Sequence, residues 1–307
     1  MGAVDRIDRR NLLYYIMYYY VRSVFNQYYR KVEVHGLENI PKDAPVIFAP
    51  NHQNALMDAL IVLFSSPGDT VFLARADLFR KKLLAWALNS LKILPVFRIR
   101  DGVDELGKNQ EIFDITVAVL HRKHQLCLMP EGNHGEKRRL RNMGKGIFRI
   151  AFKTQEKMGN QPFVKIVPVG LDISDYVKHY QTLHVNYGKP IEVSEYWDTF
   201  EENGPRGLNH LKQRLMEGLK PLMIHIETEE YYDMYMGLRT VYNARMRERL
   251  NIAGKKLQDK FNADKKMIAH LDTVLEKDEQ KLVPLKEKVE GYFAKLNQLN
   301  IRDWVVV

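Results

Sequence analysis

Short apolar runs alternate with longer amphipathic stretches from residue 32 to residue 193, and this alternation limits what the chain can fold into. The run from Val46 to Ala49 is apolar throughout, which is typical of a strand covered on both faces. The same pattern predicts strands at 32–35, 46–49, 70–74, 93–97, 125–129, 164–171, 183–187 and 190–193, and helices at 58–64, 78–91, 104–121 and 145–158. We therefore expect an α/β fold with a largely parallel central sheet flanked by helices.

Three parts are expected along the chain. Residues 1–31 form an N-terminal amphipathic helix, residues 32–204 the α/β domain, and residues 205–307 a C-terminal helical region. Beyond residue 205 glycine and proline become scarce, and leucines recur at helical spacing among many Lys and Glu residues. This pattern predicts a helical hairpin with some coiled-coil character, whose charged faces are solvated.

The N-terminal helix carries an apolar and tyrosine-rich run, Leu12 to Val21, which is about half the length needed to cross a bilayer. Arg9, Arg10 and Arg22 flank this run, and tyrosine favours the membrane–water interface. The helix therefore either lies in a membrane interface or packs on the protein's own core with its hydroxyls at the rim. At the other end, the apolar cluster from Trp304 to Val307 suggests the hypothesis that the natural polypeptide continues into a membrane segment.

Composition narrows the class of protein and its partners. Of the 307 residues, 45% are apolar, so the chain can bury a full core. The net charge of +9 favours anionic partners such as nucleic acid, anionic lipid or phosphorylated substrates. Cys127 is the only cysteine, which excludes an internal disulfide framework and any cysteine-rich metal site. A reducing, cytosol-facing location fits this cysteine content.

A histidine follows the second expected strand and precedes a helix. His52 lies at the turn, Gln53 and Asn54 are good helix-starting residues, and Asp58 follows six residues after the histidine. A histidine at the end of a buried strand is well placed to act as a general base, and a nearby aspartate can fix its tautomer. The alternative is a polar turn whose histidine caps the helix or faces solvent.

Three further features follow or interrupt expected strands, where sites lie in parallel sheets. Arg98, after the strand at 93–97, can present a planar fork to a phosphate, or it can pair with a surface aspartate. Glu131, at a turn that Gly132 permits, can bond substrate hydroxyls or hold the loop. Pro168 and Gly170 can line an acyl or pantetheine channel, or they can mark no more than a strand end.

The densest basic segment runs from His134 to Glu156, with seven Lys or Arg residues against two Glu. It suits an anionic headgroup or a membrane surface. Nucleic-acid binding is the alternative, but the segment lacks the interleaved aromatics of a single-strand binder and the spacing of a helix-turn-helix or zinc finger. We therefore expect no nucleic-acid partner.

Taken in order, these segments resemble the glycerolipid acyltransferase family, which includes glycerol-3-phosphate and 1-acylglycerol-3-phosphate acyltransferases. Its motifs are Asn-His followed by Asp, proline with arginine three residues later, Phe-Pro-Glu-Gly, and Val-Pro-Val. They are matched, in order, by Asn51-His52 with Asp58, Pro95 with Arg98, Met129 to Gly132, and Val167 to Val169. The resemblance covers roughly residues 32 to 193.

The resemblance implies transfer of a fatty acyl group from acyl-CoA or acyl carrier protein to a hydroxyl of glycerol 3-phosphate or 1-acylglycerol 3-phosphate in phospholipid synthesis. His52 would be the general base and Asp58 would hold its imidazole. The oxyanion would be met by donors on the turn after Glu131 or at the helix start near Asn54. No metal or other cofactor is implied. The substrate-binding residues would be Arg98, with Arg100 as its competitor, Glu131, Gly132, Asn133 and Pro168.

We expect a peripheral protein at the cytoplasmic face of the cell membrane, or one held there by an anchor missing from this chain. Its partners would be an anionic phospholipid surface, the acyl donor and a phosphorylated glycerol acceptor. Two alternatives stay open. The acceptor could be another lysolipid, such as an amino-acid lipid, or the chain could be a non-catalytic membrane-bound adaptor.

Two departures from the family pattern matter. Five residues separate His52 from Asp58 instead of the usual four, as in a subgroup that includes eukaryotic glycerol-3-phosphate acyltransferases. Six steps along an ideal helix rotate side chains roughly 240° apart, so the pair can meet only if His52 lies on the turn before the helix, with Asn54 as N-cap. Second, Asn133 and His134 replace the usual Thr-Arg. The candidates to replace that arginine are Arg138, Arg139 and Arg141.

Overall fold

The computed structural model describes residues 12–96, 106–159, 163–252, 254 and 256–306. The chain divides into two compact units, Met1–Met223 and Ile224–Val307. The division lies after Met223 instead of the expected residue 204, because α8 (Gly204–Leu219) joins the core of the first unit. It does so through Leu208, Leu211, Leu215 and Leu219. The N-terminal helix also belongs to the first unit.

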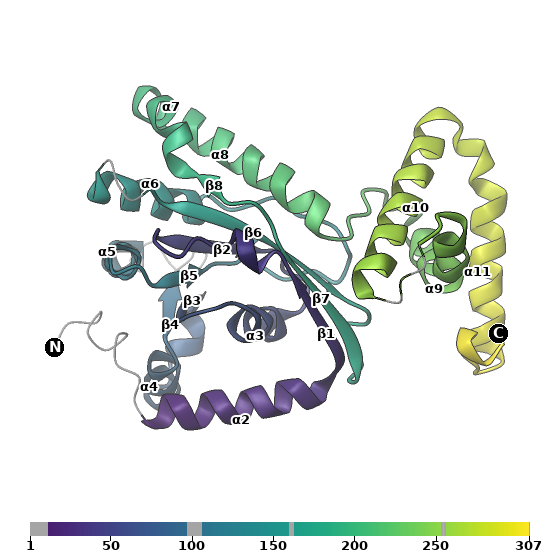
Figure 1. Cartoon of the computed structure of the whole chain (residues 1–307), viewed down its shortest axis with the longest axis horizontal. Coiled ribbons are helices and arrows are strands. Elements are labelled where there is room, and N and C mark those ends of the chain that lie inside the picture. The colour runs from purple at the N-terminus through teal and green to yellow at the C-terminus, as the bar shows by residue number, and fades with distance from the viewer. Residues whose placement is uncertain (1–11, 97–105, 160–162, 253, 255, 307) are drawn as a thin grey trace. The chain divides into compact units, whose positions relative to one another are not determined.

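A mixed sheet forms the centre of the first unit (Figure 1). In the described ranges its strands are β1 (Tyr29–His35), β2 (Val46–Pro50), β3 (Thr70–Arg75), β4 (Ile93–Val96), β5 (Gln125–Cys127), β6 (Lys165–Ile173), β7 (Gln181–Tyr187) and β8 (Ile191–Glu192). The order is β1-β7-β6-β2-β5-β3-β4, and β8 pairs with β6. Strands β6, β2, β5, β3 and β4 run parallel, whereas β7 and β8 are antiparallel to β6. The expected fold class is confirmed.

Helices cover both faces of this sheet (Figure 1). On one face, α5 (Leu106–His121), α6 (Gly146–Met158) and α8 pack on the side of β2 that carries Ile47 and Ala49. On the other face, α2 (Leu12–Tyr28) and α3 (Ala55–Ser65) pack on the side that carries Val46 and Phe48. All five residues of β2 are buried, as expected for a strand between two helical layers.

Most boundaries agree with the expected ones to within three residues. The stretch expected as one helix, 78–91, is a 3-10 turn, Ala76–Phe79, followed by α4 (Lys82–Ser90). β4 is the edge strand, which its Pro95 indicated, because an edge position tolerates a residue without an N–H. α7 (Trp197–Glu202), which precedes α8, was not expected.

α2 packs on the core of its own unit, which was one of the two alternatives, and the membrane-interface alternative stays a prediction. One face packs on α3, where Phe64 lies 5.3 Å from the Tyr18 ring and 5.1 Å from the Phe25 ring, measured between centroids. The opposite face leaves apolar side chains more than half exposed: Leu12, Ile16, Tyr19 and Tyr20. None of the helices in the described part of the chain is long and apolar enough to cross a membrane.

A short 3-10 helix, Lys220–Leu222, lies against β6. A Cβ at Gly170 would come within 1.9 Å of the Leu222 carbonyl oxygen, so only glycine permits this approach. Pro168 is buried two residues earlier, and its ring lies beside Gly218 of α8. The Val-Pro-Val-Gly stretch of β6 therefore lets this strand lie close to the end of α8 and to the 3-10 helix that follows it.

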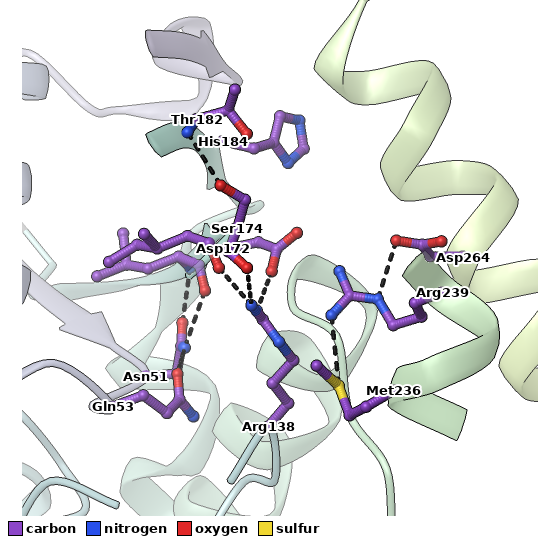
Figure 2. A network of polar contacts seen from close by, with 12 residues as sticks. Asn51, Gln53, Arg138, Asp172, Ser174, Thr182, His184, Met236, Arg239 and Asp264 are labelled. Carbon is purple, nitrogen blue, oxygen red and sulfur yellow. Dashed lines mark hydrogen bonds and ion pairs between the residues drawn. The ribbon is translucent and has the colours of Figure 1, made fainter. Parts of the chain in front are cut away.

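The second unit has three long helices in the described ranges instead of the expected hairpin. α9 (Tyr232–Arg249), α10 (Leu257–Lys277) and α11 (Val283–Gln298) enclose an apolar core. A buried polar cluster joins two of them. Asp264 of α10 accepts from Arg239 Nε at 2.9 Å (Figure 2). It also accepts from Asn243 Nδ2 at 2.6 Å. Because both carboxylate oxygens are satisfied, this cluster fixes the register of α9 against α10.

Candidate active site

The carboxyl ends of β2 and β5 lie side by side, because Ile47 pairs with Leu126 and Phe48 with Cys127. Residues that follow these two strands meet at one edge of the sheet. His52 follows β2 and Glu131 follows β5. The backbone N–H of His52 donates to Glu131 Oε1 at 2.8 Å. Two segments far apart in the sequence thus form one site.

His52 lies on the turn before α3, and Asp58 lies in the first turn of that helix. The Nδ1 of His52 is 2.9 Å from Asp58 Oδ2. The geometric requirement set by the extra residue is therefore confirmed: the histidine is off the helix and within hydrogen-bond reach of the aspartate. The Asp58 side chain is 2% exposed and the His52 side chain 13%. With Nδ1–H donating to the carboxylate, Nε2 is the nitrogen that can accept a proton.

The five-residue spacing is accommodated by an unusual backbone conformation. Ala55, the first residue of α3, has a φ of 40°, in the left-handed region that favours glycine. The chain turns there, which lets the Asp58 carboxylate reach back to the histidine. Strained residues of this kind concentrate at functional sites, so the strain at Ala55 agrees with a site at this turn.

Asp58 also completes the start of α3. Its Oδ2 accepts from the backbone N–H of Gln53 at 2.9 Å and of Asn54 at 2.7 Å. Asn54 is the N-cap residue, as expected, but its side chain makes no capping bond and instead donates to the Tyr176 carbonyl at 3.2 Å. One carboxylate oxygen thus holds the imidazole and two helix-start N–H groups together, which keeps the base rigid.

Both sides of the His52 peptide are held by the loop after β5. Its carbonyl oxygen accepts from Gly135 N at 3.2 Å and from Arg141 Nη2 at 3.3 Å. Arg141 Nε in turn donates to Glu131 Oε2 at 2.9 Å. Because Glu131 also accepts from His52 N, the ion pair of Glu131 with Arg141 fixes the position of the histidine.

The Glu131 side chain is fully buried. Burial raises the pKa of this carboxyl, while hydrogen bonds from His52 N–H and from Arg141 oppose the rise. Its oxygens already accept from His52 and Arg141. The structure therefore favours the second of the two expected roles, holding the loop, over direct contact with a substrate hydroxyl.

Asn51 joins the end of β2 to β6. Its Oδ1 accepts from Leu171 N at 2.7 Å, and its Nδ2 donates to Leu171 O at 3.1 Å (Figure 2). The same Nδ2 donates to Gln53 Oε1. These bonds extend the β2–β6 pairing by one residue through a buried side chain, so the residue before His52 is fixed to a neighbouring strand.

Arg138 cannot replace the family's headgroup arginine, because it is buried and committed within the fold. Its guanidinium forms an ion pair with Asp172 and donates to the carbonyl oxygens of Ile173 and Ser174 (Figure 2). It also lies over the Tyr176 ring, 4.8 Å from the centroid. Of the other two candidates, Arg139 is half-buried and Arg141 keeps 33% of its side chain exposed.

An exposed turn borders the histidine. Gly132, Asn133 and His134 are exposed, and Gly132 has a φ of 71° that favours glycine. The His134 ring meets the His52 ring nearly at right angles, with centroids 5.9 Å apart. The residue at the position of the family arginine is therefore next to the candidate base.

An apolar cavity of about 160 Å³ begins at the same turn, where Met129, Pro130 and Gly132 form part of its wall. The rest of the wall comes largely from β3, α5 and α6, through Leu73, Ile112, Phe113, Thr116, Ile147 and Ile150. A wall of this composition suits a hydrocarbon group.

Other expected site residues are not gathered here. Arg98 and Arg100 lie outside the described residues. Pro168 is buried where it pairs with Ala49 inside the sheet, and its ring lies beside Gly218 of α8; packing accounts for this proline, and its expected substrate-binding role stays a prediction. Cys127 is buried and its pKa is raised by burial, so the expectation of a poor nucleophile is confirmed. Within the described ranges, no three His, Cys, Asp or Glu side chains form a group that could hold a metal ion.

Sequence reasoning missed the role of two residues that fix the histidine. Arg141 was named only as one of three candidates for a headgroup contact, and nothing local indicated its bonds to Glu131 and to the His52 carbonyl. Asn51 was noted only as part of a motif, although an amide directly after an apolar strand is a signal for a strand-end hydrogen bond.

A His–Asp pair at the carboxyl end of parallel strands has the groups that general-base chemistry requires. Residues 31–172 match the family model described as Acyltransferase, so this part of the chain is similar to acyltransferases. The suspected resemblance is confirmed.

Two individual proteins are similar to this chain. Chloroplastic 1-acyl-sn-glycerol-3-phosphate acyltransferase LPAT1 of Arabidopsis thaliana is 28% identical over 171 residues, which is 54% of this chain and 45% of that protein. The chain thus spans less than half the length of this relative. The crystal structure of PlsC, the 1-acyl-sn-glycerophosphate acyltransferase of Thermotoga maritima, has a TM-score of 0.47 and 18% identity, and it covers 68% of this chain and 79% of that chain.

Proposed function

We propose that this protein transfers a fatty acyl group from a thioester donor, acyl-CoA or acyl carrier protein, to a hydroxyl of glycerol 3-phosphate or 1-acylglycerol 3-phosphate in phospholipid synthesis. The observation that carries the proposal is the 2.9 Å hydrogen bond between His52 Nδ1 and Asp58 Oδ2 on a turn that matches the family's first motif. The family match supports the reaction class, and the relative's name supports the phosphorylated glycerol acceptor.

In the proposed reaction, His52 Nε2 takes the proton of the acceptor hydroxyl as its oxygen attacks the thioester carbonyl carbon. The new C–O bond forms, the C–S bond breaks, and the proton on His52 passes to the departing thiolate. Asp58 stabilises the imidazolium while it exists. Neither a covalent acyl-enzyme nor a metal or other cofactor takes part in this scheme.

Three N–H groups within the two expected sources of oxyanion donors are already bonded. The N–H groups of Gln53 and Asn54 donate to Asp58, and the N–H of Gly132 donates to the Met129 carbonyl at 3.1 Å. These N–H groups are therefore already used within the fold. The N–H groups of Gln53 and Asn54 at the helix start hold Asp58 beside the base instead of binding the substrate oxyanion.

Positive charge near the base would bind the acceptor's phosphate. Arg98 holds the phosphate in our proposal, with Arg100 as the competitor for that role. Arg141 adds positive charge beside His52, and the His134 ring offers a further polar group there, since both border His52 and both are at least partly exposed. Phosphate recognition by such groups is charge-assisted and therefore strong.

The acyl chain of the donor, or that of an acylated acceptor, would enter the apolar cavity at Gly132. Glu131 lies one residue before Gly132 and accepts from the backbone N–H of His52. The part of the cavity wall formed by Gly132 is therefore close to the base. A chain held there would present its carbonyl end toward the loop that fixes His52.

We also propose a peripheral location at the cytoplasmic face of the cell membrane, with anionic phospholipid as the surface bound. The exposed apolar face of α2 supports this location, as do the exposed basic residues Lys137, Lys145 and Arg149 of the segment between His134 and Glu156. A phosphorylated glycerol acceptor that carries an acyl chain would reach the site from that surface.

The test is a panel in which purified protein is offered labelled acyl-CoA and acyl carrier protein thioesters against glycerol 3-phosphate, 1-acylglycerol 3-phosphate and an amino-acid lysolipid. Transfer to one of the two phosphorylated acceptors is the expected result. Transfer only to the amino-acid lysolipid would overturn the acceptor assignment. Absence of turnover with every pair, together with retained vesicle binding, would favour a non-catalytic adaptor.

A further inference from the structure

α4 is a helix that burial in the core does not explain. It spans Lys82–Ser90 and contains no buried residue. Its most apolar side chains face outward: Leu83 is 77% exposed, Trp86 58% and Leu84 44%. A helix of nine residues is marginal by itself, and most short helices are stabilised by packing an apolar face. The apolar face of α4 therefore lacks the contact that would normally stabilise such a helix.

The exposed groups of α4 form one surface. Leu83 and Trp86 are three residues apart, so they lie on the same face of the helix. Leu78, in the turn before α4, is a further exposed aliphatic residue. We name Leu78, Leu83, Leu84 and Trp86 the α4 surface.

Basic residues accompany the α4 surface. Arg80, Lys81 and Lys82 are exposed and directly precede or begin the helix. Cations at a helix N-terminus oppose the helix dipole, so helix stability does not account for them. Tryptophan beside leucine, with lysines adjacent, is instead the combination that binds the interface of an anionic bilayer.

α4 also lies near the exposed apolar face of α2. Lys92, two residues after α4, places its Nζ 5.3 Å from the centroid of the Tyr14 ring in α2. Figure 1 shows α4 next to the first turns of α2, the part that exposes Leu12 and Ile16. Two apolar helix faces therefore lie close together on one unit.

We propose that α4 docks on an anionic lipid bilayer, with Leu83 and Trp86 inserted at the level of the acyl chains and Lys81 and Lys82 against lipid phosphates. A second copy of this chain is a poorer occupant, because it would bring the same cations together. The proposal goes beyond acyl transfer and rests on the proposed function only for the choice of a lipid surface as occupant.

The experiment uses the full chain and vesicles of equal parts phosphatidylglycerol and phosphatidylcholine, with phosphatidylcholine vesicles for comparison. Binding is measured by sedimentation without any acyl donor. Trp86 is a built-in reporter: vesicles should shift its fluorescence to shorter wavelength, and Trp86→Phe should remove that component of the change. Replacing Lys81 and Lys82 by alanine should weaken binding to the anionic vesicles by roughly 25-fold. Leu83→Glu should weaken it by about tenfold or more.

Val283→Glu is the control for Leu83→Glu, because Val283 is likewise an exposed aliphatic residue in a helix but lies on α11 in the other unit. It should bind like the wild type. The double alanine variant keeps good helix formers, and an unchanged circular dichroism spectrum excludes loss of fold as the cause.

Three results would overturn the proposal. The first is wild-type vesicle binding by both the double alanine variant and Leu83→Glu. The second is an equal loss of vesicle binding in Val283→Glu. The third is a dimer that forms without lipid and that Leu83→Glu abolishes. Vesicle binding that depends on α4 in a protein without acyl transfer would leave this inference standing and remove the proposed function.

Discussion

Replacing Asp58 by asparagine should separate its electrostatic role from its structural one. The amide oxygen of Asp58→Asn can still accept from the N–H groups of Gln53 and Asn54, which Asp58 Oδ2 accepts at 2.9 and 2.7 Å. The start of α3 is thus kept. What disappears is the negative charge that lies 2.9 Å from His52 Nδ1. The imidazolium formed during the reaction would lose its counter-charge.

The size of the effect follows from this geometry. Two unit charges about 4 Å apart attract by roughly 4 kcal/mol at the effective dielectric of a partly exposed protein site. The carboxylate is buried and the imidazole nearly so, which supports a value of this order. A loss of about 3–4 kcal/mol in the transition state corresponds to a rate reduction of roughly 10²- to 10³-fold. The free energy of unfolding should fall by only about 1 kcal/mol, since the helix start keeps its acceptor.

The assay is the initial rate of thiol release from the acyl donor, with urea unfolding on the same preparations. Asp58→Ala is the contrasting variant: it leaves two N–H groups without their acceptor, at about 1–3 kcal/mol each, and should lose stability as well as activity. In a His52→Ala background, Asp58→Asn should have no further effect on rate. A rate for Asp58→Asn within a few-fold of wild type would refute the reasoning.

Variants at three further residues test the surroundings of the base. Burial raises the pKa of Glu131 in the folded state. The contribution of this carboxyl to the free energy of unfolding is therefore present below about pH 4.5 and is lost as the pH rises through the raised pKa. In Glu131→Gln, the free energy of unfolding measured against pH should lack this decline. His134→Gln should raise KM for the phosphorylated acceptor by about three- to tenfold with kcat nearly unchanged. His134→Arg should restore the wild-type KM. A fall in kcat alone would count against phosphate binding. Asn51→Leu should lower the free energy of unfolding by about 2–4 kcal/mol in urea, because both backbone groups of Leu171 lose their partner, and an unchanged midpoint would contradict the role assigned to the amide.

The sheet could be predicted because its strands are apolar on both faces and are separated by amphipathic helices. Every strand expected between residues 32 and 193 is found, and β4 is at the edge that its Pro95 indicated. The order of the strands could not be predicted in this way. β5 lies between β2 and β3, and only this order brings Glu131 beside His52.

Helix boundaries failed where tertiary packing decides them. Residues of α8 have the same leucine spacing as the helices that follow, so the sequence could not show that α8 packs on the sheet. In the same way, the spacing of Leu78 to Leu91 predicted a helix but did not show that its leucines face outward.

The site was predictable in identity but not in its supporting contacts. The His52–Asp58 pair followed from the motif, together with the demand that the histidine precede the helix. The partner of each basic residue did not follow. Arg138 is buried against Asp172, and Arg141 bonds to Glu131, because of loop positions that only the fold sets.

Acyl transfer by His52→Ala tests the central claim most directly. The imidazole's hydrogen bond is to Asp58, which keeps two backbone donors after the change, so the variant should fold with an unchanged unfolding midpoint. With a labelled acyl donor and the acceptor that the wild type uses, its turnover should fall to the uncatalysed background. Turnover within a few-fold of wild type in the folded variant would contradict His52 as the general base.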